Sequence, residues 1–169
     1  MLNLFSYTGG FSLCAVKGQA QQVVSIDVSA NFLDWSKRNF ELNHFSADGH
    51  EFRKIDSLEY LRWAKKKSLQ FDLIICDPPS FARTDKKIFK IDKDLTELVE
   101  LLAQVLAPAG RILFCSNFEG MNSRQFLNAL ITATKQTQIS ALEFHLIRED
   151  FELPHQEALM KAYLLTTKT

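Results

Sequence analysis

The amino-acid sequence predicts an α/β fold in which a doubly wound, mostly parallel sheet ends with a C-terminal antiparallel strand. Short runs of β-forming residues alternate with longer segments whose apolar residues recur every three or four positions. Such alternation is typical of parallel strands that are connected by helices. The last two strand-like runs have no helical segment between them, which indicates an antiparallel pair at the end of the sheet.

The first half of the chain contains three pairs of a strand and a helix. We expect these pairs to cover residues 2–5 and 11–17, 22–27 and 29–43, and 51–55 and 57–66. Gly18 follows the first helix as a C-cap. Ser29 and Ser57 are the expected N-caps of the next two helices, because a serine hydroxyl can accept a hydrogen bond from an amide of the first turn.

The second half begins with an apolar strand that runs directly into Asp77, Pro78 and Pro79. Proline cannot donate to a sheet ladder, so we expect a loop at this point. A turn at 108–110 closes the most strongly amphipathic helix of the chain. We expect strands at 71–76, 111–116, 141–147 and 158–167, and helices at 92–106 and 123–135.

The composition predicts one domain that spans residues 1–169. With 169 residues, of which 46% are hydrophobic, the chain is long enough for one sizeable core and too short for two ordinary domains. The 20 basic residues balance 20 acidic ones, so the net charge of zero excludes a general electrostatic attraction to nucleic acid. Any such affinity must be local or supplied by another module.

The three cysteines are odd in number and lie within apolar runs, which favours a reduced cytosolic protein over a disulfide framework. Their spacing does not suggest a zinc site or any other metal site. No uncharged run approaches the roughly 20 residues that span a bilayer, and no signal-peptide pattern is present. We therefore expect a cytoplasmic protein with no membrane partner.

The residues that follow the strands are the candidate site, because ligands of open α/β sheets bind beyond the carboxyl ends of the strands. After the first strand, Gly9 and Gly10 allow a ligand to approach the backbone and open the next helix. The turn has no G-x-G-x-x-G pattern, which argues against a dinucleotide dehydrogenase. Simple turn chemistry is an equally good interpretation of the two glycines.

Two acids end the second and third strands. Asp27 follows the glycine turn by roughly 20 residues, where an acid of nucleotide-binding folds accepts hydrogen bonds from ribose hydroxyls. The alternative is a carboxylate that is favoured by the nearby helix dipole. Asp56 could accept a hydrogen bond from an adenine amino group, but it is equally well interpreted as the start of a helix.

The most specific motif is Asp77-Pro78-Pro79-Ser80-Phe81, which follows the fourth strand. An acid followed by two prolines forms a rigid turn that is poor in donors and aims its carboxylate and carbonyls into the cleft. Phe81 can stack on a planar base, so the motif suits the binding of a flipped nucleobase. Pro78, Pro79 and Phe81 are therefore the candidate base-binding residues. The alternative is a strand that is simply terminated by prolines.

Four segments together resemble the class I S-adenosylmethionine-dependent methyltransferases of large-subunit ribosomal RNA, a family with 5-methylcytosine and 7-methylguanine members. These segments are residues 2–12, 25–29, 35–43 and 77–81. The resemblance implies a Rossmann-like methyltransferase sheet, S-adenosylmethionine as cofactor and ribosomal RNA as partner. Family members carry RNA-binding modules upstream. Because Met1 is followed at once by a strand, we expect a domain cut from a longer chain, without that upstream module; a short natural protein is the alternative.

By this resemblance, the first turn would wrap the methionine moiety of S-adenosylmethionine. The residues of this turn are Phe5, Ser6, Tyr7, Thr8, Gly9 and Gly10. Asp27 would hold the ribose, and Asp56 would lie near the adenine. Asp77 would line both the cofactor and the target base, which makes it a candidate catalytic residue.

Cys115, at the end of the fifth strand, distinguishes two reactions. Methylation of carbon 5 of a pyrimidine requires a thiolate that adds to carbon 6. The 5-methylcytosine members have a Cys-Ser pair here, as Cys115-Ser116 does, whereas the 7-methylguanine members have Ser-Asn-Asn, to which Asn117 is closer. We expect cytosine C5 as the target, with Cys115 as a catalytic nucleophile exposed at the floor of the cleft. Cys14 and Cys76 are interpreted as structural.

Two alternatives to the cytosine reaction remain open. A Cys115 that only packs would favour direct methylation of guanine N7 or of another nitrogen. A non-catalytic module that binds nucleotides or RNA is the alternative from a different class of protein.

A basic segment follows the proline turn. Its residues are Arg83, Lys86, Lys87 and Lys90. We expect them to contact RNA phosphates, which would position the RNA without reading its sequence. A solvated loop is an equally good interpretation. His155 lies near the last strand and is not expected to be catalytic.

Overall fold

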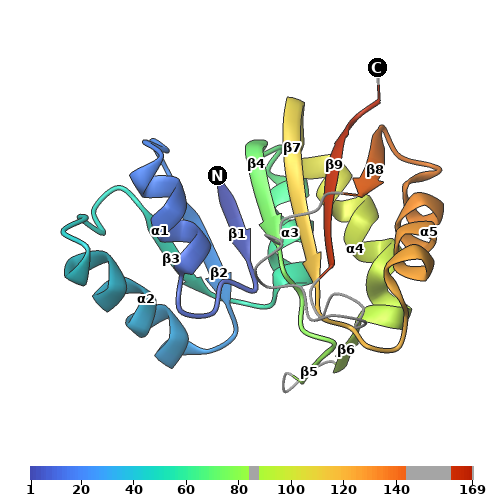
Figure 1. Cartoon of the computed structure of the whole chain (residues 1–169). Helices are drawn as coiled ribbons and strands as arrows, with labels where there is room; N and C mark the ends of the chain where they lie inside the picture. Colours follow the sequence, from blue (N-terminus) through green and yellow to red (C-terminus); the bar gives the residue numbers. More distant parts are fainter. Residues whose placement is uncertain (84–87, 144–160, 169) are drawn as a thin grey trace, which may run out of the picture.

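The computed structural model describes residues 1–83, 88–143 and 161–168. Within these residues the main strands are β1 (Leu2–Leu4), β2 (Val24–Asp27), β3 (Glu51–Lys54), β4 (Phe71–Cys76), β7 (Leu106–Ser116), β8 (Ile139–Glu143) and β9 (Lys161–Thr167). They form one sheet in the order β3-β2-β1-β4-β7-β9-β8 (Figure 1). Neighbours from β3 to β7 are parallel, and β9 is antiparallel to both β7 and β8. The predicted fold class is confirmed.

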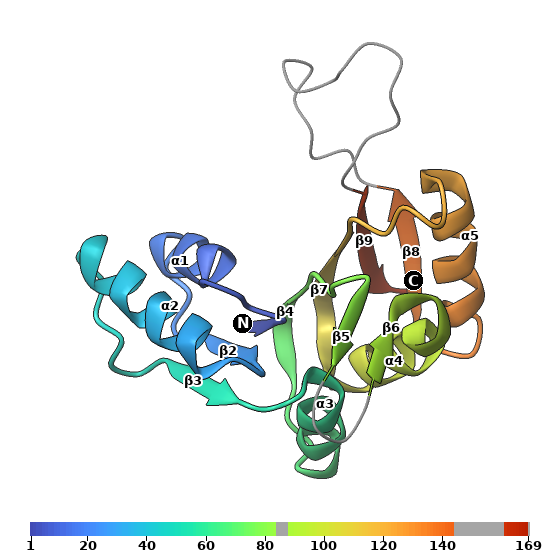
Figure 2. The ribbon, with the colours of Figure 1, turned by 90° about the horizontal axis from the view of Figure 1, so that it is seen from below.

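Helices cover both faces of the sheet. They are α1 (Gly10–Lys17), α2 (Ala30–Leu42), α3 (Ser57–Lys66), α4 (Ile91–Val105) and α5 (Ser123–Thr134). Seen along the sheet, α1 and α2 lie on one face and α3, α4 and α5 on the other (Figure 2). None of the helices in the described ranges is both long enough and apolar enough to cross a membrane.

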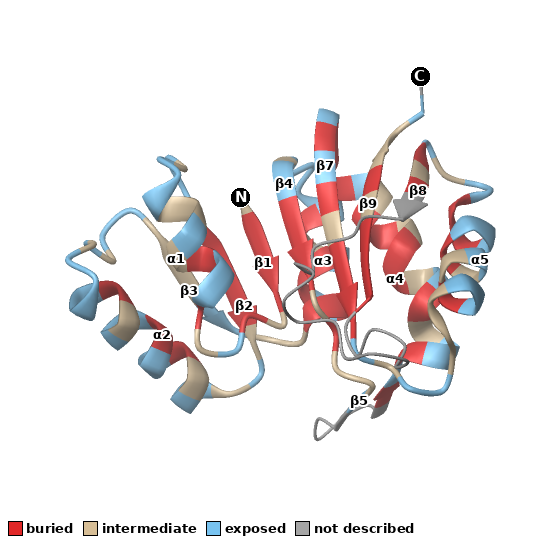
Figure 3. Ribbon diagram, in the orientation of Figure 1, coloured by how far each residue is buried: buried red, intermediate tan, exposed pale blue. Residues whose placement is uncertain are grey.

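The apolar core lies between the sheet and α3, α4 and α5, and the buried residues concentrate on the middle strands, such as β1 and the second half of β4 (Figure 3). Leu4, Cys76 and Phe114 are fully buried in this core. They share one level of the sheet, because Leu4 pairs with Cys76 and Cys76 pairs with Phe114. β1 and β4 end at Leu4 and Cys76, and β7 ends two residues beyond Phe114, at Ser116, so three chain segments leave the sheet at the same edge.

A buried polar cluster fixes α1 against the opposite face of the sheet. The amide of Asn3 donates to the Ser12 hydroxyl over 2.9 Å, and the Ser12 and Ser25 hydroxyl oxygens are 2.8 Å apart. All three side chains are at most 1% exposed. Because hydrogen bonds are directional, this cluster specifies how α1 sits on β1 and β2.

The structure corrects three local predictions. The N-cap of α3 is Asp56 rather than Ser57. The turn expected at 108–110 lies within a strand, because β7 begins at Leu106 and continues through these residues. The pairing of β7 with β4 shifts its register there. The expected loop after the proline turn contains a small antiparallel hairpin of β5 (Phe81–Arg83) and β6 (Ile88–Lys90).

Candidate active site

The glycine turn between β1 and α1 has an unusual backbone. Phe5, Tyr7 and Gly9 have φ values of 53°, 47° and 80°, all in the left-handed region. Gly9 cannot be replaced without strain, since a Cβ atom there would lie 1.9 Å from the Ser36 hydroxyl oxygen of α2. The turn is therefore pressed against α2, and the amides of the first turn of α1 open next to it.

Several hydrogen bonds hold the turn at the edge of the sheet. The Tyr7 amide donates to one carboxylate oxygen of Asp27, and the Ser29 amide donates to the other, each over 2.9 Å. The Asn39 side chain donates to the Thr8 carbonyl over 2.9 Å, and the Phe5 amide donates to the Ser57 hydroxyl over 3.3 Å. Asp27 thus joins the turn to β2.

Asn39 and Ser57 support the turn, although neither is expected to do so from the sequence. The periodicity of α2 places Asn39 on its packing face, and Ser57 is expected only as a helix cap. Their hydrogen bonds span 31 and 52 residues of sequence, so no local pattern could have revealed them.

Ser6 gives the turn a free polar group. Its hydroxyl is buried, with 6% of the residue exposed, and has no hydrogen-bond partner in the described part of the chain. A buried hydroxyl without a partner is costly, so a polar ligand at the turn would satisfy it. Each Asp27 oxygen also keeps a second lone pair beyond its backbone bond, which a ribose hydroxyl could use. These residues fit a ligand that carries ribose hydroxyls and a further polar group near Ser6.

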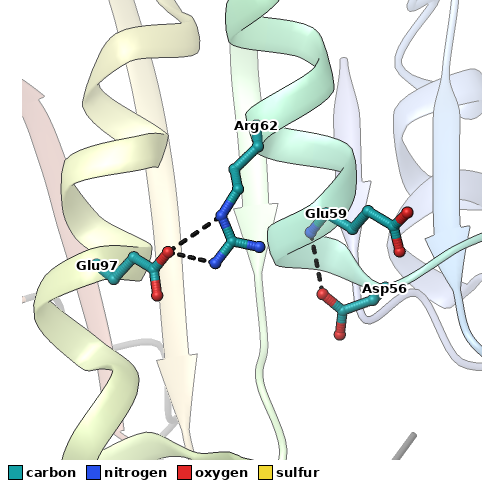
Figure 4. Close-up of polar contacts among 4 residues, drawn as sticks. All are labelled: Asp56, Glu59, Arg62 and Glu97. Carbon is teal, nitrogen blue, oxygen red and sulfur yellow. Dashed lines mark hydrogen bonds and ion pairs between the residues drawn. The ribbon is translucent and has the colours of Figure 1, made fainter. Parts of the chain in front are cut away.

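Asp56 begins α3. Its carboxylate accepts a hydrogen bond from the Glu59 amide over 3.0 Å (Figure 4). One turn later, Arg62 pairs with Glu97 and ties α3 to α4 (Figure 4). The helix-start interpretation of Asp56 is confirmed, and its contact with adenine stays a prediction.

The Asp-Pro-Pro turn leaves β4 beside the glycine turn, because Leu4 and Cys76 are partners in the sheet. Asp77 is partly buried, and this burial raises the pKa of its carboxyl above the ordinary value. The Ser80 hydroxyl donates to the Asn117 side-chain oxygen over 3.4 Å, which links the turn to the loop after β7. Phe81 opens the hairpin and is 54% exposed, so its ring is available for stacking.

Cys115 is fully buried, with 0% of the residue exposed. Burial and, secondarily, the charge of Asp77 raise the pKa of its thiol to about 12. The expectation of an exposed thiol at the floor of the cleft is wrong, because no part of the residue reaches solvent. Cys76 belongs to the core, as predicted, whereas Cys14 is exposed rather than packed beside the core.

Only part of the basic segment lies within the described residues. Lys86, Lys87 and His155 lie outside the described residues, and Arg83 is described only as the last residue of β5. Lys90 is exposed, and its amide donates to an Asp94 carboxylate oxygen over 2.8 Å. The expected phosphate contacts therefore stay predictions.

A glycine turn, an acid after β2 and an acidic proline turn at one sheet edge define an α/β domain built for a nucleoside cofactor. The family model of S-adenosylmethionine-dependent methyltransferases matches residues 1–164. The chain belongs to this family, and its cofactor is S-adenosylmethionine.

Individual relatives agree with this family. The chain is 39% identical over 153 residues to ribosomal RNA large subunit methyltransferase K of Neisseria meningitidis, a match that covers 89% of the chain and 41% of the relative. It is 41% identical over 120 residues to ribosomal RNA large subunit methyltransferase K/L of a Shewanella strain, covering 69% of the chain and 17% of the relative. The chain therefore spans less than half the length of these relatives.

A solved structure supports the fold and the cofactor. The crystal structure of SMU.776 complexed with SAH superposes with a TM-score of 0.88 at 30% sequence identity. The match covers 98% of this chain and 44% of that one.

Proposed function

We propose that this chain transfers the methyl group of S-adenosylmethionine directly to a nitrogen of a base in large-subunit ribosomal RNA, with guanine as the preferred base. The observation that carries this proposal is the complete burial of Cys115, with a thiol pKa of about 12, beside the partly buried Asp77. Both relatives from Neisseria meningitidis and Shewanella are named as methyltransferases of this RNA.

The state of Cys115 disfavours the cytosine C5 reaction. That reaction needs a thiolate within reach of carbon 6 of the base. A thiol with a pKa of about 12 is almost entirely protonated at neutral pH, and the charge of Asp77 contributes to this raised value. Activation would require both an opening of the strand end and the removal of this charge. The sequence-based preference for cytosine is therefore replaced by its alternative.

Direct transfer to nitrogen needs only a base that is held in line with the methyl group. The Asp-Pro-Pro turn offers acceptors and few donors, since prolines have no amide hydrogen. No hydrogen bond to the Asp77 carboxylate is observed from residues 1–83, 88–143 or 161–168. Its two oxygens match the adjacent N–H donors on the Watson–Crick edge of guanine. Phe81 would stack on the same base, and Pro78 and Pro79 would form the wall of its pocket.

S-adenosylmethionine supplies an electrophilic methyl group on a sulfonium. As the nitrogen lone pair forms the new bond to carbon, the sulfur–carbon bond breaks and its electron pair stays on sulfur. Transfer to a ring nitrogen such as N7 releases no proton. Transfer to an amino group releases one, which the Asp77 carboxylate can accept, helped by a raised pKa.

The cofactor would lie along the edge formed by the glycine turn, Asp27 and Asp56. The orphan Ser6 hydroxyl and the left-handed backbone of the turn support the placement of the methionine moiety there. The free lone pairs of Asp27 support the ribose position.

The decisive experiment uses Cys115→Ala and the unchanged chain, each incubated with large-subunit ribosomal RNA and S-adenosylmethionine. Methylated nucleosides are then identified by mass spectrometry after digestion. We expect methylated guanosine from both proteins, at comparable rates, and no covalent adduct with RNA that carries 5-fluorocytosine. Formation of 5-methylcytidine, or an adduct that Cys115→Ala abolishes, would restore the cytosine reaction. No methylation of RNA by a chain that binds the cofactor would refute the proposed substrate.

The basic segment would add nonspecific RNA affinity. Replacement of Arg83, Lys86, Lys87 and Lys90 by alanine should flatten the salt dependence of RNA binding. The expected change in the log–log slope is up to about 0.7 for each lost single-strand phosphate contact. The slope is measured by filter binding over a series of salt concentrations. An unchanged slope would show that these four residues are solvated and do not contact RNA phosphates.

A further inference from the structure

We infer that Phe89 is a positioning residue that couples the β5–β6 hairpin to the cofactor turn, so that the base pocket and the cofactor pocket assemble as one unit. This inference rests on the proposed function in one respect: it takes the hairpin to be the side of the site that meets the RNA base. The contact itself is independent of which atom is methylated.

The two strands of the hairpin have opposite environments. Phe81 of β5 is 54% exposed, whereas Phe89 of β6 is only 3% exposed and belongs to the main core. Phe89 pairs with Ala82, next to Phe81, in the antiparallel ladder. The Ile91 amide donates to the Ser80 carbonyl over 3.3 Å and closes the base of the hairpin. The hairpin therefore presents one aromatic ring outward and is anchored by another.

The buried ring of Phe89 contacts the cofactor turn as well as the main core. The ring centroids of Phe89 and Phe5 are 5.5 Å apart, with an interplanar angle of 43°, which is a favourable tilted geometry. Phe5 is the first residue of the turn and adopts a left-handed backbone with φ of 53°. A bulky residue is strained in that conformation, so it persists only where its surroundings enforce it.

Phe5 packs against the main core, and two of its described contacts bear directly on this conformation. Its amide donates to the Ser57 hydroxyl over 3.3 Å, and its ring packs against Phe89. The hydrogen bond fixes the backbone, and the ring contact fixes the side chain. Loss of Phe89 would release the ring of Phe5 and, with it, the start of the turn that wraps the cofactor.

A contact between two binding elements makes their ligands interdependent. If cofactor binding stabilises the turn, it also stabilises the hairpin through the Phe5–Phe89 contact, and RNA binding to the hairpin stabilises the turn by the same free energy. The site would then bind S-adenosylmethionine more tightly when a base is engaged, and less tightly without one.

The test compares two identical substitutions at matched positions. Phe89→Leu and Phe126→Leu both replace a buried ring that contacts another aromatic ring. Phe126 is 1% exposed, and its ring lies 6.1 Å from that of Phe114 and 5.6 Å from that of Tyr163. Phe126 lies on α5, away from the cofactor turn. We expect Phe89→Leu to weaken S-adenosylhomocysteine binding about two- to tenfold by calorimetry, the range for a lost aromatic pair. Phe126→Leu should leave the affinity unchanged.

A double-mutant cycle separates coupling from general destabilisation. If Phe5 and Phe89 act as a pair, Phe5→Leu with Phe89→Leu should bind S-adenosylhomocysteine no more weakly than the worse single variant. Additive losses, or an equal loss in Phe126→Leu, would overturn the inference. These measurements use only the cofactor product. If they succeed while RNA methylation fails, the proposed substrate is wrong and the positioning function of Phe89 stands.

Discussion

Substitution of Asp27 by alanine should weaken cofactor binding and loosen the glycine turn at the same time. The carboxylate accepts one hydrogen bond from the Tyr7 amide and one from the Ser29 amide, each 2.9 Å long. Hydrogen bonds to a charged group contribute about 1.5 to 3 kcal/mol each when protected from water. The Tyr7 bond is solvent-exposed and the Ser29 bond is partly buried, so water replaces part of what is lost. We therefore expect the free energy of unfolding to fall by about 1 to 3 kcal/mol.

The affinity for S-adenosylhomocysteine should fall by at least about 1 kcal/mol, roughly fivefold, because the ribose hydroxyls lose a charged acceptor. Isothermal titration calorimetry measures this change, and urea denaturation measures the change in stability. Asp34→Ala is the matched control, since Asp34 is an exposed acid on α2 whose ion pair with Lys37, at 3.4 Å, lies on the surface. An Asp27→Ala protein that binds the cofactor with unchanged affinity would remove Asp27 from the site.

The burial and hydrogen bonds of the site lead to three further predictions. Asp56→Ser should keep the N-cap of α3 and therefore the stability of the protein in urea. It should weaken cofactor binding if the other carboxylate oxygen of Asp56 contacts the adenine. An unchanged affinity would show that Asp56 acts only as a helix cap. Burial raises the pKa of the Asp77 carboxyl in the folded protein. The folded protein therefore binds the carboxyl proton more tightly than the unfolded chain does, and this contribution to stability is lost as the pH rises through the folded pKa. Asp77→Asn should therefore raise the free energy of unfolding at neutral pH while abolishing methyl transfer, and a less stable variant would contradict this sign. Iodoacetamide at neutral pH should modify the exposed Cys14 and spare the buried Cys76 and Cys115, as peptide mapping can check; rapid modification of Cys115 would contradict its burial and its thiol pKa of about 12.

The sequence predicts the position of the site better than its chemistry. Strand ends are marked by a change from apolar to polar residues, so the sequence alone places Asp27 and Asp77 at the sheet edge. The cap of α3 is harder to assign, because Asp56 and Ser57 are both good cap formers and stand side by side.

Other features depend on contacts that no local pattern encodes. The alternation of β7 puts Cys115 on the face opposite to Phe114, but its complete burial is a tertiary property that the strand pattern does not encode. The strands of the β5–β6 hairpin are three residues each, too short to show a period of two. The helical period places Asn39 on the packing face of α2, but not its partner, the Thr8 carbonyl 31 residues earlier.

The buried cluster of Asn3, Ser12 and Ser25 has a consequence for how such a domain can change over time. An apolar contact between α1 and the sheet would tolerate a small slide of the helix, whereas these three side chains allow only one placement. Replacing all three by small apolar residues would change the free energy of unfolding little. It would, however, let the start of α1 shift on the sheet, together with the glycine turn that precedes it. Selection for catalysis would then remove variants that a selection for stability alone would keep.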